Sequence, residues 1–189
     1  MTLTEMVARL ALRLGYDLDN YAGETPSTAD QYDQINFAAR TVARHVHHSR
    51  AGVALTVTSN VFQYSLHGSA FSQPMIEVWN VINNGTMLVD YLGQPGLHSY
   101  QEMNKEFPGW QTGTVSGALS TVVAACQVGT ELWVYKKPTG GGTLYVDGRC
   151  LPVKLTSGSD VSELHIDLHE AIVDIAAIYA ADPSASDNQ

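Results

Sequence analysis

A helix near the C-terminal end of the chain constrains the fold most. Its apolar residues recur at steps of four, three and four positions: Leu168, Ile172, Ile175 and Tyr179. Asp167 and Glu170 have the spacing of a capping box, which predicts that the helix begins at Asp167. Because an isolated helix this short is marginal in water, its apolar face requires a partner surface.

The N-terminal end of the chain is predicted to form two amphipathic helices, whose apolar faces provide such a partner surface. Thr2 and Glu5 repeat the capping-box spacing, and a helical apolar pattern runs from there to Leu14, where Gly15 can end the helix. A second helix is expected to begin at Ser27 or Thr28 and to reach about residue 48. We expect the helices at the two chain ends to pack on one another.

Between the helices, the hydrophobic period changes to that of β-strands. Residues 93–117 are rich in Gly and Pro and predict a functional loop or a partner-facing flap, with a short helical turn at 99–105. Asn83-Asn84-Gly85 predicts a hairpin turn. We expect six to eight strands, from candidate segments at 53–57, 61–66, 75–82, 87–91, 119–128, 131–135, 143–146, 153–155 and 164–166.

This order of elements predicts an α+β fold. The N-terminal helices and the C-terminal helix form a helical bundle, and a mainly antiparallel, β-sandwich-like region is inserted between them. We expect a helical subdomain at 1–50 plus 167–182, an inserted β subdomain at 51–166, and a flexible tail at 183–189.

The charge balance excludes several classes of function. Nineteen Asp and Glu against ten Lys and Arg leave a net charge of −9, which argues against a general nucleic-acid or anionic-membrane surface. No apolar run approaches a membrane span, and residues 1–13 resemble neither a signal peptide nor an anchor. Cys126 and Cys150 are expected to be reduced packing residues of a cytosolic product.

Two groups of histidines are candidate metal ligands, and neither is compelling. His45, His47 and His48 can be explained equally well as cations that complement the C-terminal end of a helix. His165 and His169 have a zinc-like spacing, but a helix beginning at Asp167 would leave His165 outside it. We therefore expect no metal and no cofactor.

The sequence also lacks a recognisable catalytic motif. The serine-containing segments 67–69 and 113–117 do not have the spacing of a nucleophile elbow, and Gly140-Gly141-Gly142 does not open a helix as a phosphate loop would. Asp17 and Asp19 are interpreted as a solvated acidic loop. Trp79 and Trp133 lie in strand patterns and are expected in the core, which leaves Trp110 as the candidate contact tryptophan.

Several segments taken together resemble the head-to-tail adaptor proteins of tailed bacteriophages. The similarity includes the two N-terminal helices and spans most of residues 1–182. The segments that carry it are Tyr64-Ser65-Leu66, Ile76-Glu77-Val78-Trp79-Asn80-Val81, Phe107-Pro108-Gly109-Trp110, Glu131-Leu132-Trp133-Val134-Tyr135-Lys136-Lys137-Pro138, and the closing helical segment 164–179.

The resemblance implies a non-enzymatic virion protein at the head-to-tail junction. It implies a ring of identical subunits, expected to be twelvefold, that binds the portal protein on one side and a tail or nozzle protein on the other. DNA would pass through the lumen without specific binding, and no membrane is involved. Head-to-tail neighbours in such a ring present two different surfaces to each other.

Two hypotheses concern how such a ring would work. Carboxylates lining the lumen would repel passing DNA, and aromatic residues of the long loop would anchor a neighbour. The candidate interface residues are Tyr100, Phe107 and Trp110 in the loop, and Asp182 and Pro183 at the start of the tail.

Two alternatives are kept open. One is a tail-completion protein that contacts only the tail tube. The other is a β-sandwich ligand-binding module in which Trp110 and Tyr100 touch a glycan. An enzyme is the least favoured reading, since no nucleophile or metal cluster has a recognisable spacing.

Overall fold

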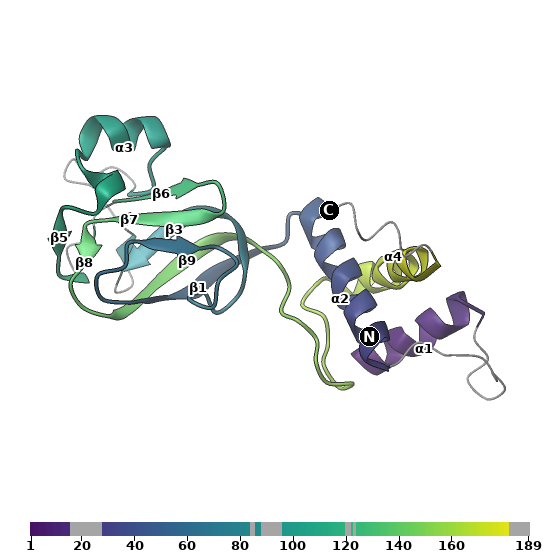
Figure 1. The fold of residues 1–189 in the computed structure, drawn as a ribbon. Helices are drawn as coiled ribbons and strands as arrows, with labels where there is room; N and C mark the ends of the chain where they lie inside the picture. Colours follow the sequence, from purple (N-terminus) through teal and green to yellow (C-terminus); the bar gives the residue numbers. More distant parts are fainter. Residues whose placement is uncertain (16–27, 84–85, 88–95, 120–121, 123, 182–189) are drawn as a thin grey trace. The chain divides into compact units, whose positions relative to one another are not determined.

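The computed structural model describes residues 1–15, 28–83, 86–87, 96–119, 122 and 124–181. The chain divides into two compact units (Figure 1). The first, here called the helical unit, contains Met1–His48 and Pro152–Gln189; the second, the β unit, contains Ser49–Leu151. Helices and mainly antiparallel sheets occur together, which confirms the predicted α+β class.

Three helices pack on one another in the helical unit. They are α1 (Leu3–Arg13), α2 (Thr28–His45) and α4 (His169–Ala181), and α4 contacts both others. Residues from both chain ends therefore share one core, as the helical patterns predicted. Its fully buried large side chains are Leu3, Met6, Leu10, Ile35 and Ile172.

The start of α1 has the geometry that its sequence predicts. The Thr2 hydroxyl accepts a hydrogen bond from the Glu5 backbone N–H at 3.3 Å, and the Glu5 carboxylate accepts one from the Thr2 N–H at 2.7 Å. Gly15 follows the helix with a positive φ of 73°, which a glycine adopts without steric cost. The predicted capping box and the glycine after the helix are both confirmed.

The predicted start of α4 at Asp167 lies two residues before the observed start, and the predicted cap is wrong. Residues Ile166–Leu168 form a 3₁₀ turn (η3), and the α-helix begins at His169. Asp167 is not the cap; instead its backbone N–H donates to Nδ1 of His165 at 3.4 Å. Glu170 does not reach back to close a capping box, because its carboxylate pairs with Arg9 and Arg13 of α1.

The β unit contains two antiparallel sheets around a common core. The four-stranded sheet has the order β1 (Ser49–Val57), β9 (Gly142–Cys150), β3 (Met75–Asn83) and β4 (Thr86–Met87). The three-stranded sheet has the order β2 (Gln63–Ser65), β7 (Glu131–Tyr135) and β6 (Ala124–Val128). A short parallel pair joins β5 (Ser116–Gly117) to β8 (Lys137–Pro138).

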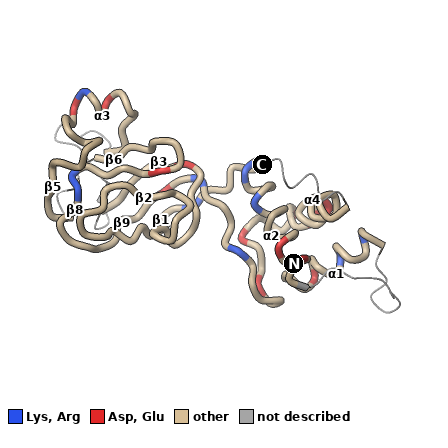
Figure 2. The backbone as a smooth tube through the Cα atoms, viewed as in Figure 1, with Lys and Arg blue, Asp and Glu red and all other residues tan. Residues whose placement is uncertain are grey.

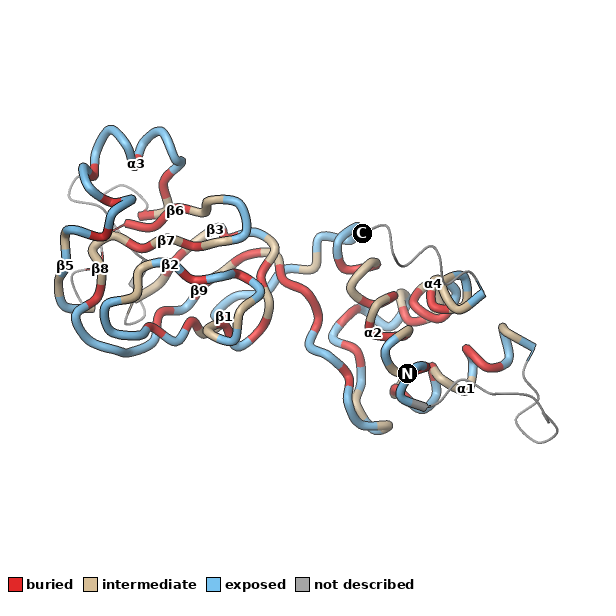
Figure 3. The backbone as a smooth tube through the Cα atoms, viewed as in Figure 1, coloured by how far each residue is buried: buried red, intermediate tan, exposed pale blue. Residues whose placement is uncertain are grey.

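Side chains of both larger sheets bury each other, as expected for a sandwich. Buried and exposed positions alternate along β1 and β9, so one face of each strand points into the core (Figure 3). Leu55 and Leu144 come from the first sheet and Tyr64 and Leu132 from the second, and all four belong to one buried cluster.

Two predicted strands do not form. Residues 153–155 and 164–166 lack strand pairing, and the backbone of Leu155 bonds to a side chain instead. The hairpin turn at 84–85 and the strand expected over 88–91 lie outside the described residues, although β3 does pair with β4. The long loop contains α3 (Tyr100–Glu106) and a 3₁₀ turn, η1 (Trp110–Thr112), so the predicted short helical turn is confirmed.

The predicted burial of Trp79 is wrong. Trp79 is 45% exposed, because the register of β3 against β9 shifts between Val78 and Asn80. The shift means that β3 has one more residue than β9 at this point. Val78 and Val81 therefore both lie in the core, and Trp79 lies on the solvent side. Trp110, which was expected at the surface, is only 4% exposed.

Candidate functional site

The described residues contain no group that resembles a metal site. No three His, Cys, Asp or Glu side chains among them lie close enough together to hold an ion. His165 lies 3.2 Å from Asp167, whereas His169 is buried and contacts the Met1 amine at 2.7 Å and the Leu164 carbonyl at 3.0 Å. The two histidines are thus engaged separately.

The titratable groups that the structure perturbs are structural. Burial lowers the pKa of His169, which favours its neutral form. Burial likewise raises the pKa of the Cys126 thiol, so it is a poor nucleophile. The pKa of Asp160 is lowered because its carboxylate accepts hydrogen bonds from the backbone N–H groups of Ser157 and Thr156. Cys126 and Cys150 are both buried and free of disulfides.

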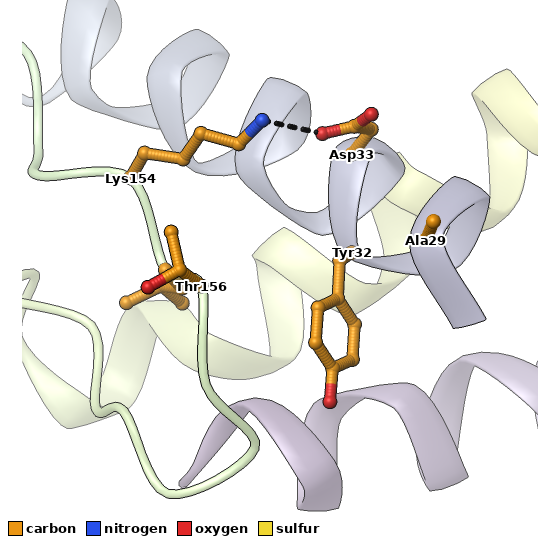
Figure 4. A pocket seen from close by; sticks show the side chains of 6 residues that line it. Ala29, Tyr32, Asp33, Lys154 and Thr156 are labelled. Atoms are coloured by element: carbon orange, nitrogen blue, oxygen red, sulfur yellow. Dashed lines mark ion pairs between the residues drawn. The ribbon is translucent and has the colours of Figure 1, made fainter.

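The described part of the helical unit contains a surface pocket between α2 and the segment 152–156. Its volume is about 230 Å³, on the scale of a single large side chain. Ala29, Tyr32 and Asp33 contribute from α2, and Lys154, Leu155 and Thr156 from the facing segment (Figure 4). Leu155 is buried at 5% exposure and gives the pocket an apolar wall. We call this cavity the α2 pocket.

Asn36 holds the two walls of the α2 pocket together. Its side-chain oxygen accepts a hydrogen bond from the Leu155 N–H at 2.7 Å, and its side-chain nitrogen donates to the Leu155 carbonyl at 2.8 Å. The same nitrogen donates to the Tyr32 carbonyl at 2.8 Å, which fixes the amide against its own helix. Asn36 is buried, so these bonds are shielded from competing water.

The rim of the α2 pocket is charged. The Lys154 ammonium lies 2.8 Å from the Asp33 carboxylate, and Figure 4 shows Lys154 reaching across to α2. Both side chains are more than half exposed, so the pair adds little to stability, about 0–1 kcal/mol. Val153 is 45% exposed, and neither it nor Lys154 has a backbone N–H bond to any described residue.

The α2 pocket combines an apolar wall with a few polar groups. It offers one ammonium, one carboxylate and hydroxyl groups around an apolar wall. Among the residues that the structure describes, none gives the side chains of this pocket an activating partner of the kind that a nucleophile or general base requires.

The aromatic residues predicted as interface anchors lie together, mostly inside the fold. Phe107 and Trp110 are buried at 3% and 4% exposure, in a cluster with Met103, Ala124 and Cys126. The Trp110 indole N–H donates to the Asn104 side chain at 2.9 Å.

Tyr100 alone of this predicted aromatic group is exposed, at 48%. Its ring packs edge-on against Trp110, with the centroids 5.4 Å apart. The predicted interface residues Asp182 and Pro183 lie outside the described residues.

The sequence patterns did not reveal the α2 pocket. Its walls meet through Asn36 and Leu155, which are 119 positions apart in the chain. Leu155 was assigned to a strand because its neighbours alternate in polarity, and Asn36 is one polar residue in an amphipathic helix. No local signal connects the two.

Comparison with known families identifies the class of protein. A family model described as SU10 adaptor protein matches residues 1–189, the whole chain. The chain belongs to the SU10 adaptor protein family. The match confirms the resemblance to phage head-to-tail adaptors. No curated protein matches the sequence at a significant level.

Membership of the SU10 adaptor family gives the coarse function. The protein is a structural adaptor of a bacteriophage virion, from a family that docks with portal and tail proteins and is normally non-enzymatic. None of the helices in the described ranges is both long and apolar enough to cross a bilayer.

Proposed function

We propose that the protein forms a closed ring of twelve identical subunits between the portal and the tail or nozzle. The family match over the complete chain is the observation that carries this proposal. In such a ring each subunit contacts its two neighbours through different surfaces, and the ring itself has two binding faces. The subunit needs no catalytic site for this role.

Exposed apolar side chains support the proposal that the subunit has several partner surfaces. Large hydrophobic residues with more than two fifths of their surface exposed occur in both units of the described structure. Contacts with neighbours or with the portal would cover side chains of this kind. In the helical unit they are Leu12, Val46, Val153, Val161, Ile166 and Ile178; in the β unit they are Trp79, Tyr100 and Tyr145.

The acidic balance fits a channel through which DNA passes without binding. The net charge is −9, and the sequence from Leu155 to the C-terminus contains seven Asp and Glu but no Lys or Arg. Carboxylates facing the lumen would repel the phosphates. Figure 2 marks basic positions on α2 toward the end that leads into β1, so we expect that surface to face a protein partner (Figure 2). A structure of the ring with a net basic lumen would contradict the channel proposal.

Within the aromatic cluster, we place the partner contact at Tyr100. Phe107 and Trp110 are buried and support it from below, with the Trp110 ring directly against the Tyr100 ring. Tyr100→Ala is expected to weaken association while leaving the thermal midpoint nearly unchanged. Asp182 and Pro183 remain proposed contacts of the C-terminal tail, and alanine substitutions there test them by the same assay.

The test is to mix the purified protein with purified portal rings and, separately, with tail tubes, and to measure the added mass. An added mass on the portal that corresponds to a complete ring of subunits supports the adaptor role. Binding to tail tubes alone would favour the tail-completion alternative. Binding to neither, together with glycan binding by the isolated protein, would favour a ligand-binding module.

A further inference from the structure

Three exposed polar side chains of α3 and η1 form a chain of hydrogen bonds over Trp110. The Trp110 indole N–H donates to Oδ1 of Asn104 at 2.9 Å. Nε2 of Gln111 donates to the same oxygen at 3.0 Å and to the Tyr100 hydroxyl oxygen at 2.7 Å. Figure 1 shows α3 beside β6 at the edge of the β unit (Figure 1). We call the exposed side chains of Tyr100, Asn104 and Gln111 the α3 triad.

The indole fixes which atoms of the α3 triad are left for a partner. An indole N–H can only donate, so Asn104 must present its oxygen to Trp110 and keep its NH₂ group free of this contact. Gln111 must then give its nitrogen to that oxygen, which leaves the Gln111 oxygen as an acceptor. Because the Tyr100 oxygen accepts the second hydrogen of the Gln111 nitrogen, the Tyr100 O–H remains a donor.

These three remaining groups have no hydrogen-bond partner in the described part of the chain. Gln111 bonds to both other members, so the α3 triad offers a donor at Tyr100, an acceptor at Gln111 and a donor at Asn104, in that order. A carboxylate or phosphate has only acceptors and would meet the Gln111 oxygen. A Lys or Arg side chain has only donors and would meet the other two groups. The pattern therefore selects an uncharged ligand that alternates acceptor, donor and acceptor.

The main chain of an extended peptide has this order along one edge. The N–H and C=O of one residue point to the same side of a strand, and those of the next residue point to the other side. One edge thus presents carbonyl, amide and carbonyl groups in succession, which is the pattern used in β-strand addition. A sugar ring would need an open aromatic face, whereas the larger ring here, that of Trp110, is only 4% exposed.

We propose that the α3 triad binds an extended main-chain segment of a neighbouring protein in the head-to-tail junction. Two carbonyl groups of that segment would accept from Tyr100 and Asn104, and the N–H between them would donate to Gln111. The proposal rests on the proposed partner contact at Tyr100 and names the chemistry of its partner. Hydrogen bonds within the triad hold the three groups in place before binding, which lowers the entropic cost of the contact.

The experiment measures the association of full-length variants with purified portal rings and, separately, with tail tubes. Tyr100→Phe removes one donor and keeps the ring. Asn104→Asp keeps an oxygen for Trp110 and Gln111 but replaces the free NH₂ group by an acceptor. Gln101→Glu is the matched control, because it adds the same charge to an exposed position of α3 outside the triad.

On the partner that the wild type binds, we expect Tyr100→Phe to weaken association roughly threefold or more and Asn104→Asp about tenfold or more. The control should stay within about twofold of wild type. Thermal melting first confirms that each variant is folded. Tyr100→Phe and Asn104→Asp that bind as well as wild type would overturn the proposal.

Electron microscopy of the complex then identifies the group that the α3 triad binds. We expect a backbone N–H of an extended partner segment at hydrogen-bonding distance from the Gln111 oxygen, with its neighbouring carbonyls on Tyr100 and Asn104. Water, a partner side chain or a glycan in that place would overturn the proposal.

The same assay separates this proposal from the adaptor role. Binding that is lost with Tyr100→Ala but kept with Tyr100→Phe would remove main-chain recognition and leave Tyr100 as an apolar contact of the adaptor. Wild type that binds neither portals nor tail tubes would contradict the adaptor role itself, and with it this proposal.

Discussion

Asn36→Ala is predicted to destabilise the helical unit selectively. The substitution removes an acceptor 2.7 Å from the Leu155 N–H and a donor 2.8 Å from the Leu155 carbonyl. Both backbone groups are buried by the surrounding core, so neither regains a water partner easily. A buried polar group left unsatisfied costs roughly 1–3 kcal/mol.

Leaving both the N–H and the carbonyl of Leu155 without a hydrogen bond lowers the free energy of unfolding by about 2–6 kcal/mol. Alanine is a better helix former than asparagine, which returns about 0.5 kcal/mol. The expected net loss is therefore about 2–5 kcal/mol, a large share of the roughly 5–15 kcal/mol that stabilises a typical domain.

The assay is urea denaturation followed by two signals. Trp79, Trp110 and Trp133 all lie in the β unit, so tryptophan fluorescence reports on that unit. Far-UV circular dichroism at the helical band reports mainly on α1, α2 and α4. We expect the dichroism midpoint to fall and the fluorescence midpoint to stay within error.

Gln34→Ala is the matched control for this measurement. It removes a similar amide from the same helix, and the Gln34 side-chain oxygen has no hydrogen-bond partner within the described structure. Its effect should be about 0.5 kcal/mol or less. Equal effects of the two substitutions, or a loss below about 1 kcal/mol for Asn36→Ala, would refute the role assigned to Asn36.

Three further predictions concern single residues. Gly148→Ala should prevent stable folding of the β unit, because its Cβ would lie on the carbonyl oxygen of Glu77; the loss of cooperative fluorescence unfolding checks this. His47 has a positive φ of 53°, so His47→Gly should raise the stability of the helical unit by about 0.5–1 kcal/mol in denaturant titration, and no gain would contradict this. The pKa of His169 is lowered in the folded state, so the unfolded chain binds the extra proton first and its contribution to stability is lost as pH falls below about 6.5. His169→Gln should flatten the pH dependence of the stability of the helical unit below about pH 6.5, and an unchanged slope would contradict the assignment.

Helix boundaries were predictable where capping is local. Thr2 and Glu5 satisfy each other within one turn, so the residues alone specify the start of α1. The same pattern at Asp167 and Glu170 failed because Glu170 pairs with Arg9 and Arg13 of another helix. A competing partner that is distant in sequence cannot be read from local spacing.

The buried face of α4 was also only partly predictable. Ile172 is buried as expected, whereas Ile175 and Tyr179 are partly exposed and His169 and Val173 are buried in their place. His169 can be buried because its ring bonds to the Leu164 carbonyl and to the Met1 amine. Polarity alone could not indicate that such partners exist.

Strand prediction succeeded where alternation is regular and failed at a bulge. The strand predicted at 131–135 is β7 with the same bounds. Trp79 was assigned to the core because a regular strand would bury it, but one extra residue in β3 reverses the face. The α2 pocket could not be predicted, since Asn36 meets Leu155 only in the folded chain.

The most direct test of the adaptor role is electron microscopy of the complex between this protein and purified portal rings. We expect a ring of twelve added subunits on one face of the portal, with an open and acidic lumen. A portal without added density, or added density that does not close around the channel, would contradict this expectation.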